Sequence, residues 1–178
     1  MATFLPGVPE VGEYNPAFAN YIQLASRIED PADILRRQWE HIAAALRELP
    51  VEKRLYRYAP GKWSVTEMVG HLMDTERVFA YRALCTARHD PAELSPFEEN
   101  DYVVSAESER CNWDELVEEF EHVRKGTALF FRHLPPEAWM RRSVVGGTST
   151  TVRTWAYATL GHAAHHLTIL KERYSGSC

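Results

Sequence analysis

The sequence contains no uninterrupted apolar run of the length that a membrane-spanning helix needs, which is about 20 residues. Its first residues, MATFLPGVPEVGEYNPAF, also lack the basic segment and apolar stretch that are typical of a secretory signal peptide. Prolines interrupt this region instead. We therefore expect a chain that does not enter a membrane and is not secreted.

Cysteine is scarce, with only three residues among 178 and no Cys-x-x-Cys pair: Cys85, Cys111 and Cys178. An oxidising compartment would leave one of three thiols unpaired, so we interpret all three as reduced. None lies in a sequence context that argues for a catalytic thiolate. The cysteine content therefore favours a cytoplasmic protein.

An excess of positive charge is also missing, because the net charge is −5 and the basic residues are scattered among acidic ones. Proteins that bind nucleic acids take most of their affinity from lysine and arginine contacts to phosphates. The sequence has no basic stripe that could supply such contacts. A nucleic-acid partner is therefore excluded from the functions that we expect.

What the sequence does contain is typical of a globular protein, with 45% hydrophobic and 25% charged residues. A chain of 178 residues predicts one domain, which we place over residues 1–178. Four segments show helical periodicity between start and stop signals. Their expected bounds are Pro31–Leu49, Ser64–Arg88, Asn112–Leu134 and Thr150–Tyr174.

Capping signals support these helices, since Asp30 precedes Pro31 and a Ser64/Glu67 pair matches a capping box. Connections of about 20 and 15 residues follow the second and third helices, and loops of this length usually carry function or small structure. Gly146-Gly147 predicts a tight turn in the second connection. We also expect a short helix around Pro16–Ser26 and no sheet. The fold class is therefore an all-α four-helix bundle.

The fourth helix carries the most distinctive residues, GHAAHHL at positions 161–167. At about 100° per residue, His162 and His166 lie on one side, at the margin of the apolar face, whereas His165 lies on the polar side. Two imidazoles one turn apart can chelate a metal ion. The alternative is that each ring only hydrogen-bonds a carbonyl. A third ligand would come from another helix, where periodicity alone leaves His71, His41 and His122 open.

Two segments together resemble the DinB-like superfamily of metal-binding four-helix bundles. PGKWSVTE (60–67) with GHLMDTER (70–77) is similar to the family's helix-two signature, and GHAAHHL (161–167) to its helix-four signature. The resemblance covers nearly the whole chain. The superfamily includes bacillithiol S-transferases and is related to mycothiol-dependent maleylpyruvate isomerase.

By this resemblance, the metal ligands would be His71 from helix two with His162 and His166 from helix four. Three neutral imidazoles leave an open coordination position, as in catalytic zinc sites. Zinc or nickel is the metal that we expect, although manganese and iron also accept imidazole. The resemblance further implies a homodimer and a small-molecule substrate, with a low-molecular-weight thiol as the second reactant.

Two acidic residues near His71 in the sequence each have two possible roles. Glu76 falls within the apolar arc of its helix, so we expect it to pair with an arginine, either Arg82 or one on another helix. The alternative role for Glu76 is support of the metal site or proton transfer. Asp74 could orient the His71 ring through its other nitrogen, or it could face solvent.

The sequence leaves three functions open. The first is a metal-dependent thiol S-transferase, in which metal coordination makes a thiolate available near neutral pH. The second is a metal-dependent hydrolase that activates water. The third is a non-catalytic metal-binding or stress-response protein. No further general base in the sequence decides among them.

Overall fold

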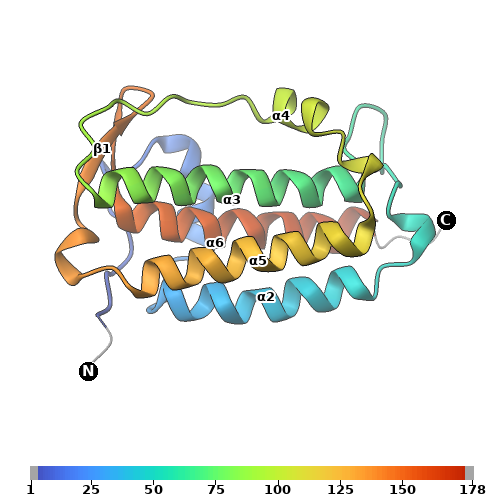
Figure 1. Ribbon diagram of the computed structural model, residues 1–178, viewed down its shortest axis with the longest axis horizontal. Coiled ribbons are helices and arrows are strands. Elements are labelled where there is room, and N and C mark those ends of the chain that lie inside the picture. Colours follow the sequence, from blue (N-terminus) through green and yellow to red (C-terminus); the bar gives the residue numbers. More distant parts are fainter. Residues whose placement is uncertain (1–3, 175–178) are drawn as a thin grey trace.

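A computed structural model describes residues 4–174 of the chain. Four long helices lie side by side along one axis (Figure 1). They are α2 (Pro31–Arg47), α3 (Val65–Ala87), α5 (Trp113–Arg132) and α6 (Val152–Ile169). The bounds agree with the periodicity of the sequence, and the prediction of an all-α four-helix bundle is confirmed.

Each long helix begins at a side chain that caps its free backbone amides. Asp30 accepts a hydrogen bond from the Asp33 amide at the start of α2, and Asn112 caps α5 in the same way. Ser64 and Glu67 form the expected capping box of α3. Such caps satisfy amides that have no partner inside the helix and are typically worth about 1 kcal/mol each.

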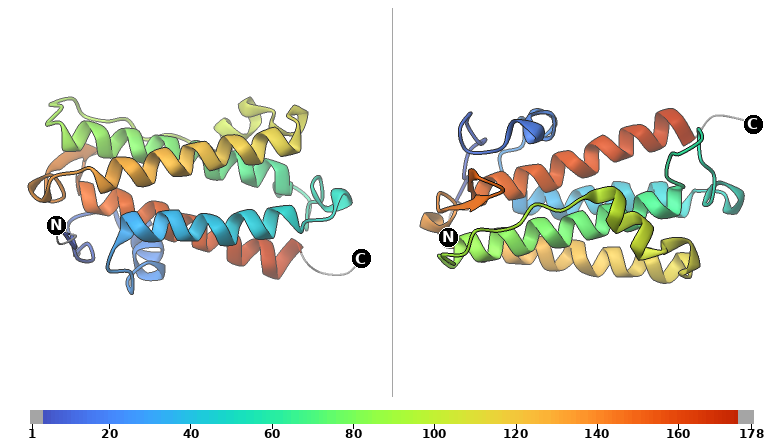
Figure 2. Two further views of the ribbon diagram at one scale, coloured as in Figure 1. Left: turned by 60° about the horizontal axis from the view of Figure 1, so that its bottom comes forward. Right: turned by 90° about the horizontal axis from the view of Figure 1, so that it is seen from above.

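The order of the helices around the bundle explains the length of the first connection. Helix α3 packs against α5 and α6, and these two helices also flank α2. Helices α3 and α5 run in the same direction, so the chain must travel back along the whole bundle between them (Figures 1 and 2). The 23 residues of α3 span about 35 Å, which the returning segment 88–112 covers. This segment carries the short helix α4 (Glu99–Ala106).

The second connection contains a β-hairpin, so the expectation that the chain has no sheet was wrong. Strands β1 (Arg142–Val145) and β2 (Thr148–Thr151) pair antiparallel. The tight turn predicted at Gly146 and Gly147 is confirmed, since both have positive φ, as a two-residue type I′ turn requires. The valines and threonines on either side favour strands. The hairpin leads directly into α6.

A short helix covers one side of α6, where the sequence predicted a helix around Pro16–Ser26. A 3₁₀ turn over Pro16–Phe18 continues into α1 (Ala19–Leu24). A Cβ atom added to Gly161 would lie only 1.9 Å from the Tyr21 carbonyl oxygen. The close approach of α1 therefore requires glycine at position 161, and it places Tyr21 beside the histidines of α6.

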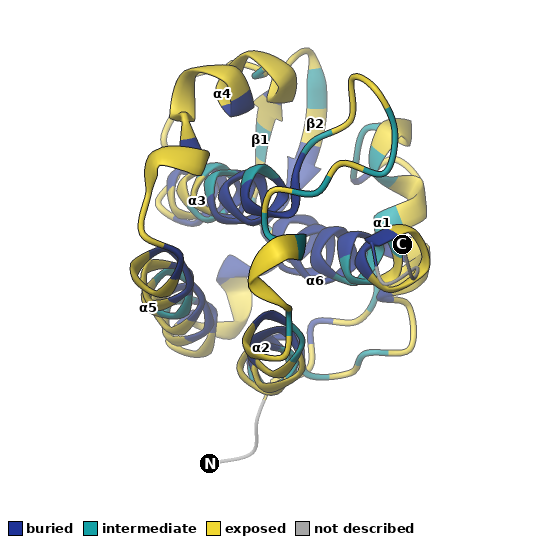
Figure 3. Ribbon diagram, turned by 90° about the vertical axis from the view of Figure 1, so that its right-hand side faces the viewer, coloured by how far each residue is buried: buried dark blue, intermediate teal, exposed yellow. Residues whose placement is uncertain are grey.

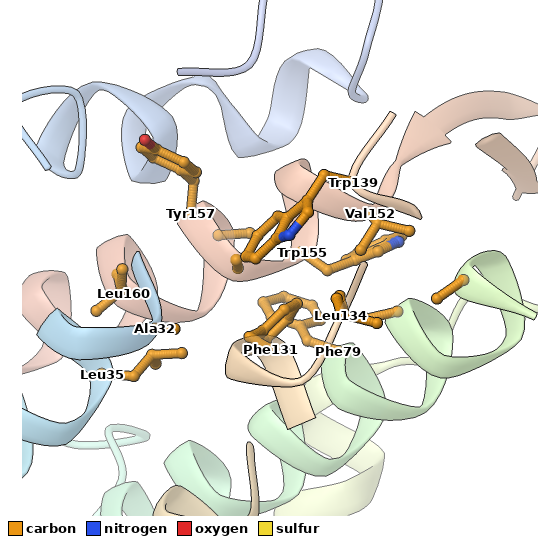
Figure 4. Packing of buried hydrophobic residues seen from close by; sticks show 14 of the residues in the cluster. Ala32, Leu35, Phe79, Phe131, Leu134, Trp139, Val152, Trp155, Tyr157 and Leu160 are labelled. Atoms are coloured by element: carbon orange, nitrogen blue, oxygen red, sulfur yellow. The ribbon is translucent and has the colours of Figure 1, made fainter. Parts of the chain in front are cut away.

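The inward faces of the four helices are buried, and the outward faces of α2 and α5 are exposed (Figure 3). Near the hairpin, Phe79, Phe131, Trp139 and Trp155 form the aromatic part of the core (Figure 4). Helix α6 is buried on every side from Val152 to Ala163, because α1 covers the side that the other long helices leave open. It is the central helix of the molecule.

The predicted fourth helix reaches its expected end, but its last turn, Leu170–Tyr174, is π-helical rather than α-helical. Cys178, one of the three cysteines interpreted as reduced, lies outside the described residues. No helix within residues 4–174 is long and apolar enough to span a membrane.

Candidate metal centre

The three histidines that the resemblance singles out lie together between α3 and α6. One ligand nitrogen from each of His71, His162 and His166 lies within 4.8 Å of the other two. His71 Nε2 and His162 Nε2 are 2.9 Å apart. The three residues are 4%, 4% and 8% exposed, respectively. Residues 91 positions apart in the sequence therefore share one buried cluster.

The helices explain why these rings meet. His162 and His166 are one turn apart on α6, with ring centroids separated by 4.6 Å. Helix α3 runs alongside α6 and places His71 against both rings, at centroid distances of 4.8 and 4.9 Å. The convergence follows from the packing of two long helices, so it does not depend on a loop.

Apolar and aromatic side chains enclose the cluster. The centroid of the Trp63 ring lies 4.6 Å from that of the His71 ring. The centroids of the Tyr21 and Phe79 rings lie 5.3 and 6.1 Å, respectively, from that of the His162 ring. Thr75 Oγ1 is 3.4 Å from His71 Nδ1. Sequence reasoning missed Thr75 as a neighbour of the imidazole, although its position one turn after His71 was a signal that could have revealed it.

Burial keeps the three rings neutral. It lowers the pKa of His71 to about 4. The pKa of His166 falls to about 3, first through burial and then through repulsion from His71 and His165. Burial also lowers the pKa of His162 well below its usual value. Neutral imidazole is the form that binds metals, so the cluster presents free nitrogen lone pairs at neutral pH.

These pKa values predict that the metal-free protein loses stability in mild acid. Above pH 6.5, His71 is neutral in both the folded and the unfolded protein. Between pH 6.5 and about 4, the unfolded chain takes up a proton at His71 whereas the folded protein does not. His71 alone should therefore cost roughly 2 kcal/mol of the free energy of unfolding at pH 5. Urea denaturation of chelator-treated protein at pH 7.5 and pH 5 measures the loss. His71→Gln should show a weaker pH dependence, and an equal dependence in both proteins would contradict the assignment.

The donor set fits a divalent metal ion. Tetrahedral bonds of about 2.0–2.1 Å place two ligand nitrogens roughly 3.3 Å apart. The ligand nitrogens of His71 and His162 are 2.9 Å apart, and all three ligand nitrogens lie within 4.8 Å of one another. Small side-chain rotations therefore suffice to bring the three nitrogens to the spacing that a metal ion requires. Among residues 4–174, no carboxylate or thiol joins the cluster. Three imidazoles can hold the ion and leave one position open.

The other histidines that the sequence offered lie elsewhere. His165 is half-buried beside the Tyr21 ring, outside the cluster. His41 Nδ1 lies near the Arg37 carbonyl and His122 Nδ1 near the Glu118 carbonyl, and both side chains are exposed. Helical phase therefore separated His166 from His165 correctly, and the resemblance selected the histidine of α3 that belongs to the cluster.

The two acidic candidates have structural partners. Asp74 pairs with Arg77 at 3.4 Å, while Thr75 is the residue beside His71 Nδ1, so Asp74 does not orient the ring. Glu76 Oε2 lies 2.8 Å from Arg124 Nη2 of α5, in agreement with the expected pairing to an arginine. The alternative partner Arg82 does not contact Glu76; it donates a hydrogen bond to the Ser95 carbonyl.

Two cavities reach the cluster from different sides. A cavity of about 420 Å³ is lined by His162, Thr75 and Phe79 together with residues of the connection before α5. A second cavity of about 230 Å³ is lined by His166 and Trp63. Glu99, at the start of α4, lines both. Small molecules can therefore approach the histidine cluster at His162 through one cavity and at His166 through the other.

Solved structures with the same architecture include YfiT from Bacillus subtilis, described as "a probable metal-dependent hydrolase with an unusual four-helix bundle topology". It is 17% identical, with a TM-score of 0.66, and the match covers 96% of this chain and 94% of YfiT. No curated protein sequence matches the chain.

The mycothiol-dependent maleylpyruvate isomerase is 14% identical, with a TM-score of 0.60, and the match covers 76% of this chain and 59% of the isomerase. A variant of that isomerase gives a TM-score of 0.62 at the same identity, over 84% of this chain and 61% of its own length. At these identities the likeness concerns the fold. The sequence itself matches the DinB superfamily over residues 34–170, which include all three clustered histidines. The chain belongs to the DinB superfamily.

Proposed function

We propose that the chain is a divalent-metal-dependent S-transferase that joins a low-molecular-weight thiol to a second small molecule. His71, His162 and His166 would hold the metal. The observation that carries the proposal is that two cavities, which share Glu99 in their lining, reach one histidine cluster, with His162 in the wall of one and His166 in the wall of the other. Two cavities give room for two organic molecules beside one metal ion, whereas hydrolysis needs room for only one besides water.

The metal, when bound, would lower the pKa of the thiol and so make the thiolate available near neutral pH. Zinc or nickel suits a site of three imidazoles, and manganese or iron can occupy the same nitrogens.

Thr75 and Trp63 hold the His71 ring in place, and Tyr21 and Phe79 limit the access of water to His162. Partial desolvation, with the nearby Glu98, raises the pKa of Glu99. A carboxylate that lines both cavities and has a raised pKa is placed to accept the thiol proton. The sulfur then forms a bond to the electrophilic carbon, and the leaving group departs with its electron pair.

Hydrolysis is the second candidate, because the likeness to YfiT extends over nearly the whole of both chains and YfiT is described as a probable metal-dependent hydrolase. In that case water would replace the thiol. We also propose a homodimer; the residues that line the two cavities described above all come from one chain.

The test is thioether formation from 1-chloro-2,4-dinitrobenzene with glutathione, bacillithiol or mycothiol, followed by absorbance and mass spectrometry. We expect metal-loaded protein to accelerate the reaction with at least one thiol. His162→Ala and chelator-treated protein should fall to the uncatalysed rate. Glu99→Gln should keep the metal and lose at least about tenfold in rate, whereas Asp101→Asn on the same helix should react normally.

Ester hydrolysis by metal-loaded protein without any acceleration by the three thiols would contradict the transferase proposal and favour the hydrolase. Equal thiol transfer by wild-type protein and His162→Ala would contradict the assignment of the metal centre to the reaction.

A further inference from the structure

A buried arginine side chain lines the larger of these two cavities and forms no ion pair with a carboxylate among the described residues. Arg82 lines this cavity and is only 4% exposed. Its Nη2 donates a hydrogen bond of 2.7 Å to the Ser95 carbonyl oxygen. Among residues 4–174, no acidic side chain forms an ion pair with it, whereas the other buried arginines, Arg124 and Arg153, pair with glutamates.

The neighbours of Arg82 leave its remaining donors free. The guanidinium lies 5.5 Å from the centre of the Phe97 ring and 5.3 Å from that of Trp155. Neither ring offers a negative charge or a hydrogen-bond acceptor in its plane, so these cation–π contacts do not take the place of an anion at the N–H groups. Nε and Nη1 have no hydrogen-bond partner within the described part of the chain.

Charged side chains are seldom buried without a partner of opposite charge, because desolvation of a lone charge is costly. Burial accordingly lowers the pKa of Arg82, and only Tyr102 acts in the opposite direction. Glu98 and Glu99 also line the cavity, but neither forms an ion pair or a hydrogen bond with Arg82. Arg82 therefore has an open position for an anion.

The helices set the distance between this position and the histidines. Phe79 and Arg82 follow Thr75 on α3 at intervals of four and three residues, so they lie along one face of the helix. Seven residues of helix rise about 10 Å. On α6, Trp155 precedes His162 by the same seven residues and contacts Arg82. The cavity thus has an arginine end and a histidine end, roughly 10 Å apart, with an aromatic wall between them.

We propose that this cavity binds a small molecule with an apolar body and a carboxylate, and that the carboxylate pairs with Arg82. A planar guanidinium binds a carboxylate through two parallel hydrogen bonds. If the proposed function holds, the end of the molecule opposite the carboxylate is the end that reacts, and this part of the inference rests on that function. The pairing of the carboxylate with Arg82 is independent of it.

The probes are 4-phenylbutyrate, which has a suitable length, and its neutral amide, with binding measured by calorimetry. We expect the acid to bind wild-type protein at least about tenfold more tightly than the amide. Arg82→Gln should abolish this preference. Arg77→Gln, which changes an exposed arginine of the same helix, should keep it. If Arg82→Gln does not fold, Ala17→Phe, which adds a ring at an exposed position lining the cavity, should weaken binding of the acid.

Chelator-treated protein separates this inference from the proposed function. Binding of the acid should persist without metal, even if the protein proves to have no metal-dependent activity. Loss of binding on chelation would show that the carboxylate binds the metal, and would overturn the proposal. Equal affinity for acid and amide, or unchanged binding by Arg82→Gln, would also overturn it.

Discussion

Replacing Arg124 by alanine is expected to lower the free energy of unfolding by about 3–5 kcal/mol, because the change leaves the Glu76 carboxylate buried without its counter-charge. Arg124 and Glu76 are 1% and 2% exposed in their side chains, and their charged atoms lie 2.8 Å apart. Arg124 Nη1 also donates to Gln38 Oε1, and Gln38 Nε2 donates to the Leu160 carbonyl. The network connects all four long helices.

Urea denaturation monitored by circular dichroism measures the effect. Burial already raises the pKa of Glu76, so without Arg124 the carboxyl should take up a proton more readily and the loss should shrink as the pH falls. The surface variant Arg77→Ala should change stability by less than about 1 kcal/mol. The double variant Glu76→Leu/Arg124→Met removes both charges and should recover most of the loss. A loss below about 1 kcal/mol for Arg124→Ala would contradict this account.

Single replacement of His71, His162 or His166 by alanine is expected to abolish stoichiometric metal binding, because two imidazoles rarely suffice to retain an ion during purification. His165→Ala is the matched control, since His165 lies next to His166 in the sequence but outside the cluster. It should bind as much metal as wild-type protein. Elemental analysis of untagged protein measures the ratio of metal to chain.

Metal retained by His166→Ala and lost by His165→Ala would contradict the geometry of the cluster. Far-ultraviolet circular dichroism of each variant is the control for folding. The three alanine variants should keep the helical signal of the wild type, because the bundle is also held by the two hydrophobic clusters.

Much of the fold follows from local physics that the sequence displays directly. Caps at Asp30, Ser64 and Asn112 set the starts of the helices, and apolar periodicity sets their length. The hairpin at 142–151 was missed because its strands have only four residues each, too few for an alternating pattern to stand out. The Gly-Gly turn between valines and threonines was the signal for it.

Features that depend on packing between distant segments were beyond sequence reasoning. Helical phase put His162 and His166 on one side of α6, but the choice of His71 needed a resemblance, because periodicity cannot say which helices become neighbours. For the same reason, the sequence named Arg82 as one possible partner of Glu76, whereas the partner is Arg124 of α5. The cavities arise from the segment that returns between α3 and α5, and no local pattern predicts its path.

The most direct test of the metal centre is an anomalous difference map from crystals of untagged protein, recorded at the absorption edges of zinc and nickel. We expect a single strong peak per chain, about 2.0–2.1 Å from one nitrogen each of His71, His162 and His166. A protein that binds no ion at these rings after incubation with either metal, or that binds it at other residues, would contradict the central claim.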